Sequence, residues 1–302
     1  MQLSGTVVPM ATPIEERSGD VDESTLERFT DSLIEAGVHG LFPGSSIGEF
    51  SSLTREQNRT VIRTVAAATA GRVPVIAGCC DTSVEGVLES VESAAAADAD
   101  AAVVVAPYYL TTTQRGLRRF FTRVADRAPM PVLLYNIPAL TGNRIAAETV
   151  VALAEHDDIV GVKDTSGDLT YHHRIITETP EEFAVFQGAT EMASSSLDLG
   201  TSGLIAGPAN VFPAALTRLY EAHAANDRET VARLTRDVVA PLVSAMSEVP
   251  TAAAIKYLVA IDGLDLGDPL PPLPTLTARQ RESLDRAHRH VVETVESAST
   301  ER

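Results

Sequence analysis

Lysine and cysteine are both scarce in this sequence. Of its 24 basic residues only Lys163 and Lys256 are lysine, so the other 22 are arginine. The two cysteines, Cys79 and Cys80, are adjacent, which is poor geometry for a disulfide bridge and gives no metal-ligand spacing. We therefore expect neither a disulfide framework nor a metal site. Because arginine is the usual basic residue of this chain, each of the two lysines needs an explanation.

Long apolar runs and an excess of positive charge are also missing. No stretch approaches the roughly 18 consecutive apolar residues that a membrane span needs, and residues 1–5 lack the features of a signal peptide. The 41 acidic residues give a formal net charge of −17, which disfavours non-specific attraction to nucleic acid or anionic lipid. We expect a cytoplasmic protein that acts on a small molecule, with no nucleic-acid or membrane partner.

The acidic excess combined with scarce lysine is typical of protein surfaces in a salt-rich cytoplasm. There, a dense acidic coat keeps a protein solvated although salt screens its charges strongly. An ordinary acidic protein encoded by a GC-biased genome is the alternative interpretation. Composition favours the first interpretation, so we expect a halophilic protein.

Short segments of strand character alternate with longer segments of helical periodicity, as in repeated βα units. The expected strands are residues 6–10, 40–42, 73–77, 101–105, 132–135, 159–162, 184–187 and 203–205. Eight strand-helix pairs within about 225 residues favour a closed (β/α)8 TIM barrel over an open doubly wound sheet. We assign residues 1–225 to the barrel and residues 226–302 to a C-terminal helical extension, with helices near residues 230–247, 251–261 and 277–297.

Lys163 directly follows the apolar run 159–162, which predicts a position at a strand end, where the loops of a barrel meet at one mouth. Desolvation by apolar walls disfavours the ammonium form of lysine and exposes the amine lone pair for attack on a carbonyl. The alternative is an ion pair with Asp164 or Asp168 on a solvated loop. Arginine could hold such a charge but could not form an imine, so lysine here favours a Schiff-base enzyme.

Two other segments could supply groups that a Schiff-base enzyme needs. Tyr135 is expected one strand away, and its hydroxyl could move the protons of imine formation and carbon–carbon cleavage, although many barrel tyrosines are merely packed. Residues 45–48, Ser-Ser-Ile-Gly, form a loop whose backbone N–H groups could hold a carboxylate. The loop matches no nucleotide-binding motif, and an imine already serves as an electron sink, so we expect no cofactor and no metal.

Taken together, these segments resemble the N-acetylneuraminate lyase and dihydrodipicolinate synthase family of pyruvate-dependent aldolases. The likeness runs from about residue 5 to residue 274, and its most specific motifs are Tyr-Asn-Ile-Pro at 135–138 and Gly-Val-Lys-Asp at 161–164. The resemblance implies that Lys163 forms the imine, that Tyr135 transfers protons, and that Ser46 relays protons to it. It also implies a homotetramer in which Tyr109, a second relay, reaches across a subunit interface.

The resemblance also marks a substrate pocket and two departures from the family pattern. Gly188 and Ile205 would line the pocket for the pyruvyl group. Ile47 stands where the family usually has threonine, so a backbone N–H would have to bind the carboxylate there. Leu140 stands where synthases that condense pyruvate with aspartate semialdehyde carry an arginine. Because leucine cannot make that bidentate contact, a synthase is disfavoured.

We therefore expect a class I aldolase that reversibly cleaves 2-keto-3-deoxygluconate, or its 6-phosphate, to pyruvate and an aldehyde. Thr165, Thr190 and Glu191 could meet the hydroxyls of such a sugar acid, although each, read alone, is more simply a loop or capping residue. A 4-hydroxy-tetrahydrodipicolinate synthase, an N-acetylneuraminate lyase and a sugar-acid dehydratase are alternatives on the same scaffold. A non-catalytic barrel that binds 2-oxo acids is the alternative of another class, and it would need neither Lys163 nor Tyr135.

Overall fold

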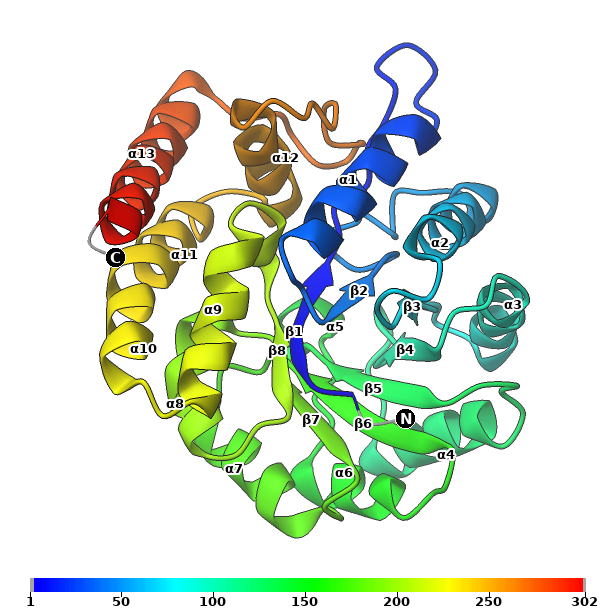
Figure 1. Ribbon diagram of the computed structural model, residues 1–302. Helices are drawn as coiled ribbons and strands as arrows, with labels where there is room; N and C mark the ends of the chain where they lie inside the picture. The colour runs from blue at the N-terminus through cyan, green and yellow to red at the C-terminus, as the bar shows by residue number, and fades with distance from the viewer. Residues whose placement is uncertain (1–2, 301–302) are drawn as a thin grey trace.

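The computed structural model describes the backbone of residues 3–300 and the side chains of residues 3–295. At its centre lies a ring of parallel strands surrounded by helices (Figure 1). The strands are β1 Gly5–Pro9, β2 Gly40–Phe42, β3 Ile76–Gly78, β4 Ala101–Val105, β5 Val132–Asn136, β6 Ile159–Asp164, β7 Ala184–Gln187 and β8 Gly203–Ile205.

The order of the strands is β2-β1-β8-β7-β6-β5-β4-β3. A parallel bridge between Leu41 and Val75 joins the first and last members of this series, and the Leu41 N–H donates to the Pro74 carbonyl at 2.9 Å. The sheet thus closes on itself, which leaves few backbone groups unpaired at an edge. The predicted (β/α)8 TIM barrel is confirmed.

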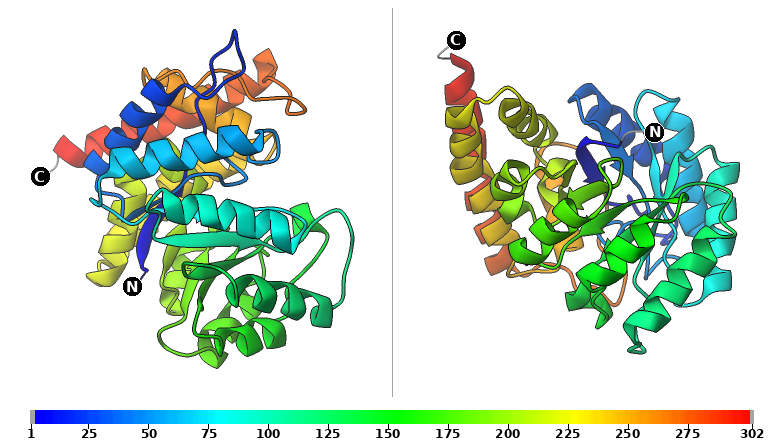
Figure 2. Two further views of the ribbon diagram at one scale, coloured as in Figure 1. Left: turned by 90° about the vertical axis from the view of Figure 1, so that its right-hand side faces the viewer. Right: turned by 90° about the horizontal axis from the view of Figure 1, so that it is seen from below.

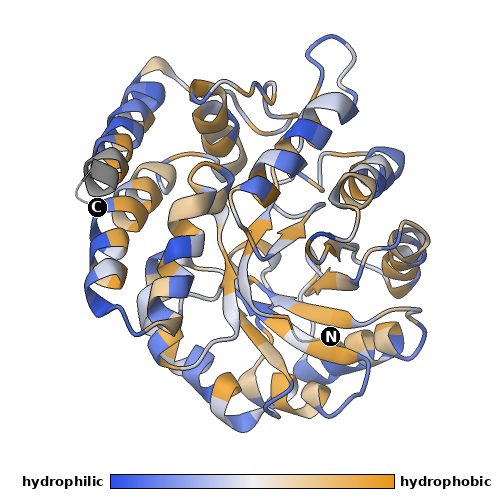
Figure 3. Ribbon diagram, in the orientation of Figure 1, coloured by the Kyte–Doolittle hydropathy of each residue, from blue (hydrophilic) through white to orange (hydrophobic). Residues whose placement is uncertain are grey.

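The outer helices of the barrel surround its strands, and several of them begin at a residue whose side chain caps them. They are α1 Glu23–Glu35, α2 Arg55–Thr69, α3 Val84–Ala96, α4 Gln114–Ala125, α6 Ala147–Ala154, α7 Leu169–Glu178, α8 Ala193–Asp198 and α9 Pro213–Ala224. The side chains of Asp22, Thr54, Ser83 and Thr113 each accept a hydrogen bond from the backbone N–H three residues later. Such caps satisfy donors that the first helical turn leaves free. Figure 3 shows the apolar strands inside this ring and polar residues on its outer side.

Four strands differ in their bounds from the sequence-based prediction: β1 lies one residue earlier, β5 ends one residue later, and β3 and β6 differ more. The predicted strand 159–162 continues as β6 to Asp164, so Lys163 lies within the strand and pairs in register with Tyr135 of β5. The predicted strand 73–77 is shorter and later, as β3 Ile76–Gly78. Pro74 has no N–H to donate to a ladder, which is why regular pairing begins after it.

The C-terminal helices lie together on one side of the barrel (Figures 1 and 2). They are α10 Arg228–Leu234, the π-helical turn η3 Thr235–Val239, α11 Ala240–Met246, α12 Thr251–Ile261 and α13 Ala278–Thr300. Leu234, Val238 and Leu242 belong to the same apolar cluster as Met10 and Leu204 of the barrel. The C-terminal segment therefore shares the barrel core. The predicted boundary after residue 225 stays a prediction, and residues 301–302 lie outside the described residues.

The inside of the barrel is filled by its own apolar cluster. It contains Phe42, Leu133, Tyr135, Phe186 and Ile205, contributed by four of the strands. Because side chains alternate along a strand, their neighbours point outward against the helices. Within the described residues, no helix is long and apolar enough to cross a membrane.

Candidate active site

A cavity of about 570 Å³ opens where the strands end. Residues that follow β1, β2, β5, β6, β7 and β8 contribute to its wall, as expected for the functional end of a TIM barrel. The site residues predicted from the sequence that line it are Ser46, Ile47, Tyr135, Lys163, Thr165, Gly188, Glu191 and Ile205. Of the predicted site residues, only Tyr109 lies elsewhere. The fold therefore brings together residues that are up to 159 positions apart, from Ser46 to Ile205.

Lys163 is almost fully buried, with 5% of its surface exposed, and it lies against aromatic rings. Its ammonium nitrogen is 4.2 Å from the centre of the Tyr135 ring and 5.0 Å from that of Phe42. No carboxylate of the described residues lies within 4.0 Å of this nitrogen. The alternative ion pair with Asp164 or Asp168 is therefore wrong. The Lys163 amine faces the cavity without an ion-pair partner among the described residues, as a nucleophile requires.

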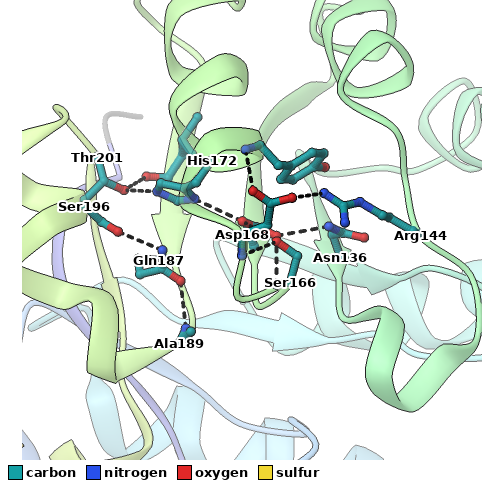
Figure 4. Close-up of polar contacts among 12 residues, drawn as sticks. Asn136, Arg144, Ser166, Asp168, His172, Gln187, Ala189, Ser196 and Thr201 are labelled. Atoms are coloured by element: carbon teal, nitrogen blue, oxygen red, sulfur yellow. Dashed lines mark hydrogen bonds and ion pairs between the residues drawn. The ribbon is translucent and has the colours of Figure 1, made fainter. Parts of the chain in front are cut away.

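Asp164 points to the outer side of the barrel, because neighbours in a strand alternate. Its carboxylate accepts hydrogen bonds from Asn136 Nδ2 at 3.0 Å and from the backbone N–H of Ser166 at 3.0 Å. The His172 ring lies 3.1 Å away and also contacts Thr201 at 3.2 Å. Figure 4 shows Asn136, Ser166, His172 and Thr201 in this network. These buried bonds anchor β6 directly behind Lys163.

Asp168 caps α7 instead of pairing with the lysine. Its carboxylate accepts the Tyr171 N–H at 3.0 Å and pairs with Arg144 at 2.8 Å, which Figure 4 shows on the side of Asp168 away from His172. The hydrogen bond from Tyr171 and the Arg144 contact lower the pKa of Asp168 below its usual range. The carboxylate thus stays ionised at neutral pH and completes the start of α7.

Tyr135 and Ser46 both face the cavity, but no hydrogen bond joins them in the described structure. The Tyr135 ring packs edge-on against Phe42, with ring centres 6.5 Å apart. This packing fixes the ring beside the lysine, and the hydroxyl group has no hydrogen-bond partner among the described residues. The relay from Ser46 to Tyr135 that the family resemblance implies stays a prediction.

The loop after β2 offers two unused backbone donors. The Gly48 N–H donates to Ser45 Oγ at 3.1 Å, and Thr12 Oγ1 donates to the Gly48 carbonyl at 2.8 Å. The N–H groups of Ser46 and Ile47, by contrast, have no acceptor among the described residues. Backbone donors beside a cavity are normally satisfied, so this pair is suited to bind an anion such as a carboxylate.

Gly188 keeps open the space between Lys163 and Thr165. A methyl group placed on Gly188 would lie 3.0 Å from Lys163 Cε and 2.1 Å from Thr165 Oγ1. The Thr165 hydroxyl is buried and has no hydrogen-bond partner among the described residues. An unsatisfied buried hydroxyl costs free energy, so it is suited to meet a polar group of a bound ligand.

The charged residues that line the cavity are Lys163 and Glu191 alone, within the described part of the chain. Leu140 lines it too, with 66% of its surface exposed at the mouth. Among the described residues, the site therefore has no arginine for the carboxylate of an amino-acid semialdehyde or for a phosphate. No group of three metal-binding side chains occurs among the residues described.

Tyr109 lies outside this cavity, with 91% of its surface exposed and a left-handed backbone with φ of 74°. Its neighbour Leu110 is also exposed. Tyr109 cannot act on a ligand in the cavity of its own chain in this conformation. Its predicted action across a subunit interface is compatible with this exposure and stays a prediction.

The outer wall of the cavity was not predicted from the sequence. Val243, Met246, Ser247 and Thr251, from α11 and the start of α12, face the strand ends across the opening. These residues carry no motif, and they reach the site only because the C-terminal helices fold back over the barrel. Their apolar and hydroxyl groups restrict the entrance without adding charge.

Comparisons with known proteins agree with this geometry. Residues 2–291 match the model of the Dihydrodipicolinate synthetase family. The 4-hydroxy-tetrahydrodipicolinate synthase of Exiguobacterium sibiricum is 37% identical over 298 residues, 98% of each chain. A DapA-like lyase of Halobacterium salinarum, named as uncharacterised, is 34% identical over 94% of this chain and 92% of that protein. A similar solved structure is that of YagE from E. coli K12, a prophage protein of the dihydrodipicolinic acid synthase family, in complex with pyruvate. The two structures superpose with a TM-score of 0.92 at 29% sequence identity, over 96% of this chain and 99% of YagE.

Proposed function

The chain belongs to the dihydrodipicolinate synthetase family, and from this membership we propose that it is a class I lyase whose Lys163 forms an imine with pyruvate. The observation that carries the proposal is the buried Lys163 amine, which faces the cavity without a carboxylate partner. An amine in such a place is not engaged in an ion pair and is positioned to attack a carbonyl.

The proposed reaction starts from the free Lys163 amine and regenerates it at the end. The neutral Lys163 amine adds to C2 of pyruvate, and the carbinolamine loses water to give the imine. Loss of a proton from C3 gives an enamine, which attacks the aldehyde carbon and forms the new carbon–carbon bond. Water then hydrolyses the imine and frees the lysine, and cleavage runs through the same steps in reverse. Tyr135 is the proposed proton carrier because its ring contacts the lysine.

The free N–H groups of Ser46 and Ile47 would hold the pyruvate carboxylate. Two donors on one anion orient the 2-oxo group, as they do in other backbone anion sites. The gap at Gly188 and the apolar side chain of Ile205 leave room for the methyl carbon of pyruvate beside Lys163.

The names of the relatives favour the condensing reaction of a 4-hydroxy-tetrahydrodipicolinate synthase, in which the aldehyde is aspartate semialdehyde. They support this activity better than the cleavage of a sugar acid that the sequence analysis put first. The synthase assignment requires that another group replace the arginine that is missing at Leu140. The hydroxyl groups of cavity residues such as Ser166, Thr190 and Thr251 are the available substitutes.

Cleavage of 2-keto-3-deoxygluconate is the second candidate, and Leu140 is the observation that favours it. A cavity whose charged residues are Lys163 and Glu191 suits a neutral polyhydroxy chain, whose hydroxyls Thr165 and Glu191 could bind. The same lack of cations disfavours the 6-phosphate, because a phosphate needs Arg, Lys or several N–H donors. The protein has a role in carbohydrate metabolism only if it cleaves this sugar acid.

We further propose that the active form is a homo-oligomer, with a tetramer as the expected state. The exposed Tyr109 and Leu110 would lie in an interface, where Tyr109 could reach the cavity of a neighbouring subunit. The predicted cytoplasmic location stays part of this proposal.

Borohydride trapping tests the proposed function. Pyruvate and borohydride should add one reduced pyruvyl group to the peptide that contains Lys163, as mass spectrometry would show. Lys163→Arg is the matched control, since it keeps the charge and removes the imine-forming amine. The absence of an adduct despite pyruvate binding would identify a non-catalytic 2-oxo-acid-binding barrel, and an adduct on Lys256 would also refute the mechanism.

The aldehyde is identified by offering pyruvate with aspartate semialdehyde, glyceraldehyde or glyceraldehyde 3-phosphate in parallel. The synthase assignment requires that aspartate semialdehyde has the highest kcat/KM. Preference for glyceraldehyde would establish the sugar-acid activity instead.

A further inference from the structure

The second lysine of the chain, Lys256, forms a buried ion pair with Glu49. The Lys256 ammonium nitrogen lies 2.6 Å from Glu49 Oε1, and the two side chains are 2% and 0% exposed. The nitrogen also donates to the Asp268 carbonyl at 3.1 Å. Lys256 does not line the catalytic cavity, so it is not a second nucleophile there. Lys256 belongs to α12, so the ion pair joins this helix to the loop after β2.

Glu49 belongs to that loop, next to the donors that face the cavity. Its backbone has a left-handed φ of 59°, and its N–H donates to the Ser46 carbonyl at 3.2 Å. Its other carboxylate oxygen accepts the Leu270 N–H at 2.6 Å. The Glu49 side chain thus fastens the loop to the C-terminal segment, while the Glu49 backbone closes the turn that presents Ser46.

Lysine rather than arginine at position 256 is informative in a chain that uses arginine at 22 of its 24 basic positions. A compact ammonium fits between the Glu49 carboxylate and the Asp268 carbonyl, whereas a planar guanidinium is wider and needs a different set of acceptors. Buried ion pairs are weak sources of stability, because desolvation offsets much of their attraction. Burial lowers the pKa of Lys256, and Glu49 opposes that shift. A geometric role explains the pair better than stability does.

We infer that Glu49 and Lys256 are positioning residues that set the Ser46 and Ile47 N–H groups for the carboxylate of the 2-oxo acid. The inference rests on the proposed function, because it concerns the anion end of the same site. It makes the C-terminal helices part of the catalytic unit, since α12 holds a barrel loop in its binding conformation. Neither residue touches the substrate.

The test compares the variants Lys256→Arg, Lys256→Met and the neutral pair Glu49→Gln/Lys256→Met. The readouts are the pyruvate concentration that gives half-maximal trapping on Lys163, the Tm, and hydrogen exchange of residues 45–50 without ligand. We expect half-saturation to rise about tenfold in each variant, equal to about 1.4 kcal/mol. The trapped fraction at saturating pyruvate should stay unchanged, because Lys163 and Tyr135 are intact. Exchange in the loop should be faster.

The neutral pair separates positioning from stability. It removes both buried charges, so its Tm should recover relative to Lys256→Met, while its half-saturation should stay high. His288→Leu is the matched control, since it breaks the 2.9 Å contact of the buried His288 with Asp262 in the same segment without touching the loop. It should lower Tm and leave half-saturation and loop exchange unchanged.

Half-saturation within about twofold of wild type in all three variants, with only Tm reduced, would overturn the inference. Lys256→Arg and the neutral pair keep the test decisive if Lys256→Met does not fold. Absence of trapping in the wild-type protein would refute the proposed function, and hydrogen exchange of residues 45–50 would still decide whether the ion pair holds the loop.

Discussion

Lys163 and Tyr135 are register partners on adjacent strands, and the lysine nitrogen lies 4.2 Å from the centre of the tyrosine ring. The ring face is electron-rich and partly offsets the burial of the ammonium form. No carboxylate of the described residues lies beside the amine, so an ion pair does not hold it away from the cavity. Packing of two side chains from one sheet therefore places the proposed nucleophile and the proposed proton carrier together.

Replacement of Tyr135 by phenylalanine should separate packing from proton transfer. The ring that supports Lys163 would remain, so Tm should change little, while kcat should fall by about 10² to 10⁴ because the proton carrier is lost. Borohydride trapping at high pyruvate should still label Lys163. Steady-state turnover with the preferred aldehyde is the measurement, and a kcat within about tenfold of wild type would contradict the proposed role.

Replacement of Gly188 by alanine should block the site by direct collision. The new methyl group would meet Lys163 Cε at 3.0 Å and Thr165 Oγ1 at 2.1 Å, so pyruvate capture should fall sharply. Gly167→Ala is the matched control, since Gly167 lines the same cavity with open space around it but has φ of 73°. The control should lose about 1 kcal/mol of stability and still capture pyruvate. Equal loss of capture in both variants would rule out the steric explanation.

The barrel was predictable because its strands repeat a simple pattern. Strands β2, β4, β7 and β8 have the predicted bounds, since short apolar runs between polar helices leave little ambiguity. The predicted end of β6 was too early, because Lys163 and Asp164 read as a charged loop. In the structure each has its own reason to be buried. Lys163 enters the cavity, and Asp164 is satisfied by Asn136 and His172 behind the sheet.

The parts of the site that were not predicted depend on long-range contacts. Glu49 and Lys256 are separated by 207 positions, and neither residue belongs to a pattern that identifies the other. Thr251 reaches the cavity only through the packing of α12 on the barrel. Periodicity determines which face of an element is buried, but it carries no information on which distant polar groups meet.

Replacement of Asp168 by alanine should weaken α7 without affecting imine formation. Loss of the cap should cost about 1 kcal/mol at neutral pH, and the exposed Arg144 pair adds little. Because the folded pKa of Asp168 is lowered, its contribution is present above its usual value of 3.8 and is lost as the pH falls through the lowered value. The Tm difference between wild type and variant should therefore shrink at acid pH. A constant difference would show that the carboxylate charge is not involved.

Replacement of Leu140 by arginine should change the choice of aldehyde. An arginine at the cavity mouth could bind a second carboxylate through two parallel hydrogen bonds, which are worth about 1.5 to 3 kcal/mol. The kcat/KM for aspartate semialdehyde should rise about tenfold or more relative to that for glyceraldehyde. Leu140→Lys is the control for charge alone and should give a smaller gain. No change in the ratio would mean that the acceptor carboxylate is bound elsewhere.

Salt should stabilise this protein, because its acidic residues outnumber its possible partners. Of 41 acidic residues at most 24 can pair one-to-one with a basic residue, so at least 17 remain and repel one another. Raising KCl from about 0.1 M to about 1 M shortens the Debye length from about 10 Å to about 3 Å and suppresses that repulsion. The same salt weakens exposed ion pairs such as Arg59–Glu89, which are individually worth little. Repulsion should therefore dominate, and both Tm and turnover should rise with KCl.

Potassium chloride is preferred to sulfate for this measurement, because sulfate stabilises most proteins by exclusion from their surface. A Tm that falls with KCl would show that the arginine ion pairs, rather than the unpaired acidic residues, control stability.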